Sequence, residues 1–223
     1  MMASYGIATP PSTQLNHIVY LSPPLKKDLI VYGPVSFTLY ASTTEKVTSD
    51  WSFFVKLGEM VPKAVPLNPV TGLPEMKPEV NDISTPKNVQ IWSWGSLKAK
   101  FREVDKSLSL TGMPWHTFSN PQRLSPGTVY EFQIELQPVF KTFKKGRRLW
   151  LKIASDDALY STLDSTSQYV ETPLIPDGCI SIYHDDKYPS YLLLPVVSDA
   201  PETIQVKSPL RDALPGAPRF IVS

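Results

Sequence analysis

An all-β fold, in the form of a β-sandwich, is what this sequence predicts, and three observations lead to it. Large apolar residues alternate with polar ones at a period of two, as they do in half-buried strands. Proline accounts for 23 of the 223 residues, and most prolines fall between these alternating stretches, where they interrupt no strand. No stretch has a convincing helical period. Roughly eight to ten short strands at this spacing are typical of a sandwich or jelly roll.

The clearest strand pattern lies in residues 124–153. After a Pro-Gly turn, every second residue of a first strand is apolar, at positions Tyr130, Phe132, Ile134 and Leu136. A turn with two lysines and a glycine follows, and a second strand then places its aliphatic residues at Leu149, Leu151 and Ile153. We expect these two strands to form an antiparallel pair that supplies part of the core.

The remaining strands are predicted in chain order from the same alternation. They are residues 17–20, 29–32, 35–40, 51–57, 91–94, 97–101, 179–183 and 191–196. Gly33-Pro34 predicts a turn between two of them, and residues 107–120 read as a loop. The last two strands look like a pair joined by a turn at Asp185-Asp186.

The chain divides into a sandwich with two extensions. Residues 1–14 are small and polar and form an N-terminal arm, residues 15–198 form the sandwich, and residues 199–223 form a C-terminal tail. Within the sandwich, residues 60–90 form a long proline-rich loop. A loop of this length in a compact domain is typical of a functional or disordered segment.

Charge and composition exclude several classes of partner. The net charge is +1 and the isoelectric point is near 7.8, so no strong field attracts nucleic acid or a membrane surface. No run of 18 apolar residues occurs, and the N-terminus has no secretory signal. We expect neither nucleic acid nor a membrane as a partner, and we expect a cytoplasmic location. The lone Cys179 excludes an internal disulfide and has the apolar neighbours of a buried strand residue.

No pattern for catalysis or metal binding is found. The sequence contains no G-x-S-x-G, H-E-x-x-H or C-x-x-C motif, and the three histidines, His17, His116 and His184, are isolated from one another. Asp156, Asp157 and Asp164 could be compared with a calcium site, but their spacing fits no EF-hand and solvated loop acids are the simpler interpretation. We therefore predict no catalytic residue, no metal and no cofactor in this chain.

Four aromatic residues are the candidates for binding. A sugar ring stacks on exposed indole or phenol rings, and core or interdomain packing uses the same side chains. The candidates for contact with a glycan or a protein partner are Trp92, Trp94, Trp115 and Tyr188.

Five motifs in order resemble the C-terminal domain of the cocaine esterase (CocE/NonD) and X-Pro dipeptidyl-peptidase family of serine hydrolases. They lie at residues 33–42, 50–57, 95–102, 124–138 and 143–156. The family's usual Gly-His-Arg is Gly146-Arg147-Arg148 here, and residues 60–90 are longer than the family pattern. The resemblance implies a jelly-roll sandwich of the galactose-binding type.

The same resemblance implies an accessory function. In that family an α/β-hydrolase domain precedes this one and carries the catalytic triad, and none of those three residues maps onto this chain. The chain would then be no enzyme by itself. It would brace the hydrolase domain of the same parent protein, with a role in walling the cleft or in forming homo-oligomers, while the parent cleaves esters or X-Pro amides. The alternative is a carbohydrate-binding module, since similar sandwiches bind glycans.

Overall fold

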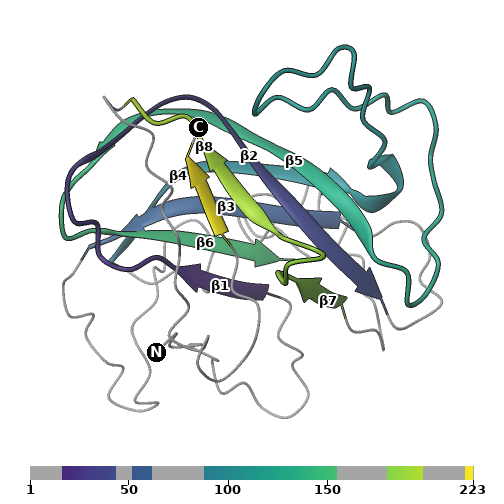
Figure 1. Ribbon diagram of the computed structural model, residues 1–223, viewed down its shortest axis with the longest axis horizontal. Coiled ribbons are helices and arrows are strands. Elements are labelled where there is room, and N and C mark those ends of the chain that lie inside the picture. Colours follow the sequence, from purple (N-terminus) through teal and green to yellow (C-terminus); the bar gives the residue numbers. More distant parts are fainter. Residues whose placement is uncertain (1–16, 44–51, 62–87, 155–179, 198–218, 223) are drawn as a thin grey trace, which may run out of the picture.

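The computed structural model describes residues 17–43, 52–61, 88–154, 180–197 and 219–222, and these residues form two β-sheets packed face to face (Figure 1). Cys179, Asp156, Asp157 and Asp164 lie outside the described residues, as do the N-terminal arm and most of the long proline-rich loop. The prediction of an all-β sandwich is confirmed. The finer jelly-roll description stays a prediction.

The first sheet has the strand order β1-β6-β3-β4. Its strands are β1 (His17–Leu21), β6 (Arg148–Ala154), β3 (Ser52–Met60) and β4 (Val89–Lys98), and each neighbouring pair is antiparallel. The second sheet has the order β5-β2-β8-β9, and β7 also pairs with β2. Its strands are β5 (Tyr130–Phe143), β2 (Leu29–Thr43), β8 (Tyr191–Leu194), β9 (Arg219–Val222) and β7 (Ile180–Tyr183).

The core lies between the two sheets and is made by the inward positions of the alternating strands. Phe53 of β3 and Phe132 of β5 meet across it with ring centroids 4.9 Å apart. The other large, fully buried side chains of the core include Phe37, Phe143, Leu39, Leu57, Ile134, Leu136 and Leu149. Except for Phe143, which lies beyond the predicted strands, these residues occupy alternating positions of predicted strands, so the period-two pattern in the sequence located them correctly.

Gly33 and Pro34 do not form the predicted turn. They lie inside β2, which runs unbroken from Leu29 to Thr43 and shifts register against β5 between Gly33 and Val35. Between Gly33 and Val35 the strand β2 has one residue, Pro34, and the facing part of β5 has two, Gln137 and Pro138, and neither proline can donate a backbone hydrogen bond to the ladder. Gly33 has φ of +137°, a backbone conformation that favours glycine. The dipeptide therefore lies opposite a β-bulge whose extra residue belongs to β5.

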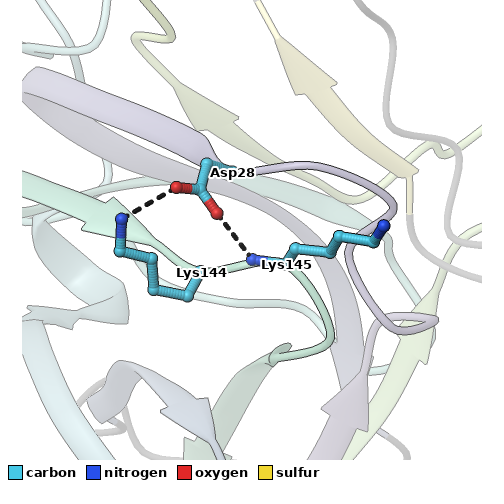
Figure 2. A network of polar contacts seen from close by, with 3 residues as sticks. All are labelled: Asp28, Lys144 and Lys145. Atoms are coloured by element: carbon cyan, nitrogen blue, oxygen red, sulfur yellow. Dashed lines mark hydrogen bonds and ion pairs between the residues drawn. The ribbon is translucent and has the colours of Figure 1, made fainter.

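The strands β5 and β6 were expected to form an antiparallel pair, but they do not pair with each other. Each lies in a different sheet, so the lysine-rich turn between them carries the chain from one sheet to the other. Asp28 holds this turn: its carboxylate accepts hydrogen bonds from Lys144 Nζ and from the Lys145 backbone N–H, both at 2.8 Å (Figure 2). The Lys144 ammonium group thus has a local structural partner.

The C-terminal strands differ from the prediction in a similar way. β7 and β8 each pair with β2 and are not a pair with each other. Beyond them, β9 pairs in parallel with β8, so a strand lies in the segment predicted to be a tail. Partner choice between distant strands is set by packing over the whole sheet, which local alternation does not encode.

Candidate interaction surface

The most distinctive feature outside the core is a structured loop between β4 and β5. β4 ends in a short 3₁₀ helix, η2 (Ala99–Phe101), and the chain then makes a long excursion before β5 begins at Tyr130. We call residues 103–120 the aromatic loop. It projects beyond the strands at one end of the sandwich, as the teal trace at the upper right of Figure 1 shows. A long ordered loop on a rigid scaffold is a common carrier of function.

Arg102 and Glu103 fasten the base of the aromatic loop. Arg102 Nη1 donates to the carbonyls of Ala99 and Gln122 at 3.2 and 2.9 Å, and its guanidinium lies 4.4 Å from the centre of the Tyr130 ring. The Glu103 carboxylate accepts hydrogen bonds from the side chains of Thr117, Asn120 and Gln122. The two ends of the loop are therefore tied to each other and to the start of β5.

His116 attaches the middle of the aromatic loop to the sandwich. Its Nδ1 lies 3.0 Å from the carbonyl oxygen of Phe101, and its Nε2 lies 2.8 Å from the carbonyl oxygen of Gln133 on β5. The side chain is partly buried and both ring nitrogens face acceptors, so its role here is structural. His116 also forms an isolated β-bridge with Val104, which closes the loop into a narrow ribbon.

Asp105 orders the far half of the ribbon. Its backbone N–H donates to the Trp115 carbonyl at 2.8 Å, and its carboxylate accepts from both the hydroxyl and the backbone N–H of Ser107. These hydrogen bonds hold the pKa of Asp105 below its ordinary value, so the carboxylate is ionised at neutral pH. Reciprocal backbone bonds between Leu110 and Met113 close the tip.

The side chains that this framework presents to solvent are largely apolar. Eleven large hydrophobic residues are exposed among those the structure describes, and five of them belong to the aromatic loop, with exposures between 42% and 69%. They are Leu108, Leu110, Met113, Trp115 and Phe118. Single exposed apolar residues are ordinary, but a concentration of them on one short, ordered segment indicates a contact surface.

Phe118 carries an unusual backbone conformation. Its φ is +52°, and no other residue except glycine has a positive φ among the described residues. A bulky side chain adopts the left-handed region only when its surroundings hold it there. Here the ring of Phe118 packs against Phe101 and His116, with centroids 5.8 and 5.7 Å apart, and its outer face stays in solvent.

Trp92 and Trp94, two of the predicted binding residues, lie on different sides of β4. The register of β3 and β4 shifts so that Leu57 pairs with Ser93 and Gly58 with Ile91, which makes Trp92 an extra residue at a bulge. Trp92 packs against the core, and its ring lies 3.6 Å from Lys141 Nζ. Trp94 pairs with Lys56 of β3 and is 38% exposed.

Trp115 and Tyr188, the other two predicted residues, are also separate from each other. Trp115 belongs to the aromatic loop and is 57% exposed. Tyr188 lies between β7 and β8, where its ring packs against Tyr40 and Tyr183. Among the described residues, no ring contact joins any two of the four, and binding of a glycan or a partner by them stays a prediction.

Four exposed residues of the aromatic loop are not among the predicted binding residues. Leu108, Leu110, Met113 and Phe118 are assigned by the sequence only to a loop, because they follow neither a strand nor a helix period. The density of large apolar side chains in a segment without periodicity was the available signal. Such residues have no face of their own to bury, so exposure is the expected outcome.

No second kind of site is found in the described part of the chain. Within those residues, no three His, Cys, Asp or Glu side chains lie close enough together to hold a metal ion. Nor does this part contain a helix whose length and hydropathy would allow it to span a bilayer. His184, near Tyr20, and His116 lie in separate environments.

Comparison with known proteins adds a family and several structural neighbours. The family model of the X-Pro dipeptidyl-peptidase C-terminal non-catalytic domain matches residues 3–193. A CocE/NonD family hydrolase from Staphylococcus aureus has a similar structure, with a TM-score of 0.58 and 20% identity over 82% of this chain and 30% of that one. No curated protein sequence matches the chain.

Two further solved structures share the fold. An aminopeptidase from a marine sediment archaeon, Thaumarchaeota archaeon, has a TM-score of 0.55 and 21% identity over 84% of this chain and 27% of that one. An alpha-amino acid ester hydrolase has a TM-score of 0.52 and 20% identity over 82% of this chain and 26% of that one. The chain thus spans less than a third of the length of each neighbour.

Proposed function

The chain belongs to the family of X-Pro dipeptidyl-peptidase C-terminal non-catalytic domains, and from this we propose that it is the accessory domain of a serine hydrolase. The observation that carries the proposal is the family match over residues 3–193. A non-catalytic C-terminal domain implies a catalytic domain in the same parent protein. In this proposal the parent cleaves esters or X-Pro amides with an α/β-hydrolase domain, and its location is cytoplasmic.

The accessory domain would act by bracing its catalytic partner. A sandwich with a continuous core is rigid, and a contact made only in the folded state stabilises whatever domain it touches. The aromatic loop supports this role, because its hydrogen-bonded backbone holds several apolar side chains in solvent, where a second domain can contact them. Walling of the substrate cleft and formation of homo-oligomers are finer forms of the same role.

Activity and stability measurements on the parent protein test the proposal. We expect the purified 223-residue chain to hydrolyse no p-nitrophenyl ester, and we expect the parent protein with this domain deleted to lose thermal stability. The control is the intact parent, assayed at the same concentration of folded protein. Turnover by the pure chain, or an unchanged melting temperature after deletion, contradicts the proposal.

A carbohydrate-binding module is the second candidate, and the exposure of Trp94 and Trp115 favours it. An exposed indole on a rigid scaffold can stack on a sugar ring. A glycan screen with the chain, repeated with Trp94→Ala and Trp115→Ala, separates the two functions. Binding that both substitutions weaken supports the module. A chain that retains no glycan on the screen supports the accessory domain.

A further inference from the structure

We propose that the aromatic loop, residues 103–120, is the surface on which the catalytic domain of the same parent protein docks. This inference rests on the proposed function and adds the location of the contact. The exposed side chains that we assign to the contact are those of Leu110, Met113, Trp115 and Phe118.

The loop is already ordered in the form that a partner would need. Arg102 and Glu103 hold its base, His116 attaches it to η2 and β5, and the Leu110–Met113 bridge closes its tip. Docking then orders few additional groups, and the entropy cost of association stays small. A mobile loop with the same composition would lose much of the free energy of contact to its own ordering.

Its chemistry matches that of an interface centre with a polar rim. Trp and Met are enriched at the buried centre of interfaces, where charged residues are scarce. The charged residues Glu103, Asp105 and Lys106 all precede the exposed apolar residues in the loop's sequence, and Lys106 is exposed. Asp105 has its hydrogen bonds within the loop, so a neighbouring domain need not supply any.

The likeness to much longer chains identifies the occupant. The matched domain covers at most 30% of each solved neighbour, so about seven-tenths of each lies outside it. The family is defined as a C-terminal non-catalytic domain, so that remainder holds the catalytic part. The exposed part of five side chains is on the order of several hundred Å², less than the ~800 Å² per partner typical of separate chains. A tethered domain has an effective concentration of about a millimolar, and a smaller contact suffices.

A second apolar pair on the sandwich provides a matched control. Tyr32 and Phe140 lie opposite each other on β2 and β5, are similarly exposed, and pack edge to face with centroids 4.7 Å apart. Each of the two rings already packs against the other. We therefore expect them to stay in solvent when the catalytic domain is present.

Hydroxyl-radical footprinting of the intact parent protein and of the 223-residue chain tests the assignment. We expect the oxidation rates of Met113 and Trp115 to fall about tenfold in the parent, because a docked centre excludes water. Tyr32 and Phe140 should oxidise at equal rates in both. In calorimetry, Leu110→Ser with Trp115→Ser should separate the parent's coupled melting into two transitions, and Tyr32→Ser with Phe140→Ser should not. Circular dichroism of both variant chains checks that the sandwich still folds.

The other outcomes overturn the inference in distinguishable ways. If the loop oxidises equally in both proteins and another surface becomes protected, the docking site is wrong and the accessory function stands. If no surface of this domain becomes protected in the parent, the accessory function fails as well. If the loop is protected in the isolated chain and that protection disappears on dilution, a second copy of the chain is the occupant.

Discussion

At the scale of single residues, His184 connects burial to pH. The ring is partly buried and lies edge-on to Tyr20, with centroids 6.2 Å apart. Burial lowers the pKa of His184, and the nearby Asp185 offsets this only in part. The folded state therefore binds this proton less readily than the unfolded state does, so protonation favours unfolding. At a pH where His184 is neutral in both the folded and the unfolded state, its titration has no effect on the free energy of unfolding. As the pH falls below the ordinary pKa of histidine, the unfolded state takes up the proton first and the free energy of unfolding decreases.

Urea unfolding at a series of pH values measures this effect. We expect the free energy of unfolding to fall from about pH 7 to about pH 5, and to fall less steeply in His184→Gln. His116→Gln is not a suitable control, because that ring holds the aromatic loop. Equal slopes for wild type and His184→Gln would show that other groups carry the pH dependence.

Gly95 marks a close approach of β4 in the first sheet to β5 in the second. A Cβ atom at this position would lie 1.9 Å from the carbonyl oxygen of Glu135 and 3.1 Å from Leu136 Cα. Backbone atoms cannot turn aside as a side chain can, so β4 and β5 would have to separate. We expect Gly95→Ala to lower the free energy of unfolding by about 3 kcal/mol, at the upper end of overpacking effects.

Gly127→Ala is the matched control for this prediction. Gly127 has φ of +74°, and a Cβ atom added there would meet no atom within 4 Å, so only backbone strain of about 1 kcal/mol applies. Chemical denaturation of the two variants gives the comparison. Equal losses would mean that the close approach of β4 and β5 does not constrain the sandwich.

At the scale of elements, the base of the aromatic loop should be separable from the stability of the sandwich. Glu103 accepts three side-chain hydrogen bonds, from Thr117 and Asn120 near the C-terminal end of the loop and from Gln122 just after it. We expect Glu103→Ala to increase amide exchange at Asp105 and Thr117 about tenfold, since those amides bond across the ribbon. The melting temperature of the sandwich should change little.

Glu131→Ala supplies the comparison for that experiment. Glu131 also accepts side-chain hydrogen bonds, from Tyr40 and Gln133, but on the surface of the second sheet. Exchange within the loop should be unaffected by it. Loop amides that exchange equally fast in both variants would locate the restraint elsewhere, for example at His116.

Strand positions were predictable because burial on one face imposes a period of two on each segment separately. The pairing of the strands was not predictable in this way, because β5 and β6 pair with strands of different sheets, and β7 and β8 both pair with β2. Gly33-Pro34 illustrates the difference. The same dipeptide is compatible with a turn and with a position inside a strand, and here it lies opposite the extra residue that Gln137 and Pro138 introduce on β5. Such information lies about a hundred residues away along the chain.

The candidate site was predictable to a similar extent. Trp115 was chosen from its residue type alone, as an aromatic side chain that could stack or pack, and the structure places it in solvent on the aromatic loop. Trp92 and Trp94 are two positions apart on one strand, so simple alternation predicts that they face the same side. Trp92 is instead the extra residue of a bulge in β4, and it packs against the core. The contribution of the rest of the loop depends on hydrogen bonds that no local pattern reveals.

At the scale of the whole molecule, an ion pair between Lys141 and Glu59 links the two sheets. Lys141 on β5 lies 3.1 Å from Glu59 on β3, and the two side chains are only 18% and 6% exposed. The Lys141 ammonium also lies 3.6 Å from the centre of the Trp92 ring. The pair therefore lies at the edge of the core. Both charged groups have lost most of their contact with water there, and their mutual attraction compensates for that loss.

Removing one partner should cost more than removing both. We expect Glu59→Gln to lower the free energy of unfolding by about 2 kcal/mol, because Lys141 is left partly buried without its carboxylate. Adding Lys141→Met should recover much of that loss, since the long apolar side chain can still pack on Trp92. Lys144→Met, which breaks the exposed pair with Asp28 in Figure 2, should produce no measurable change. A double variant that is less stable than Glu59→Gln would show that the ion pair itself, and not the avoidance of an unpaired charge, holds the sheets together.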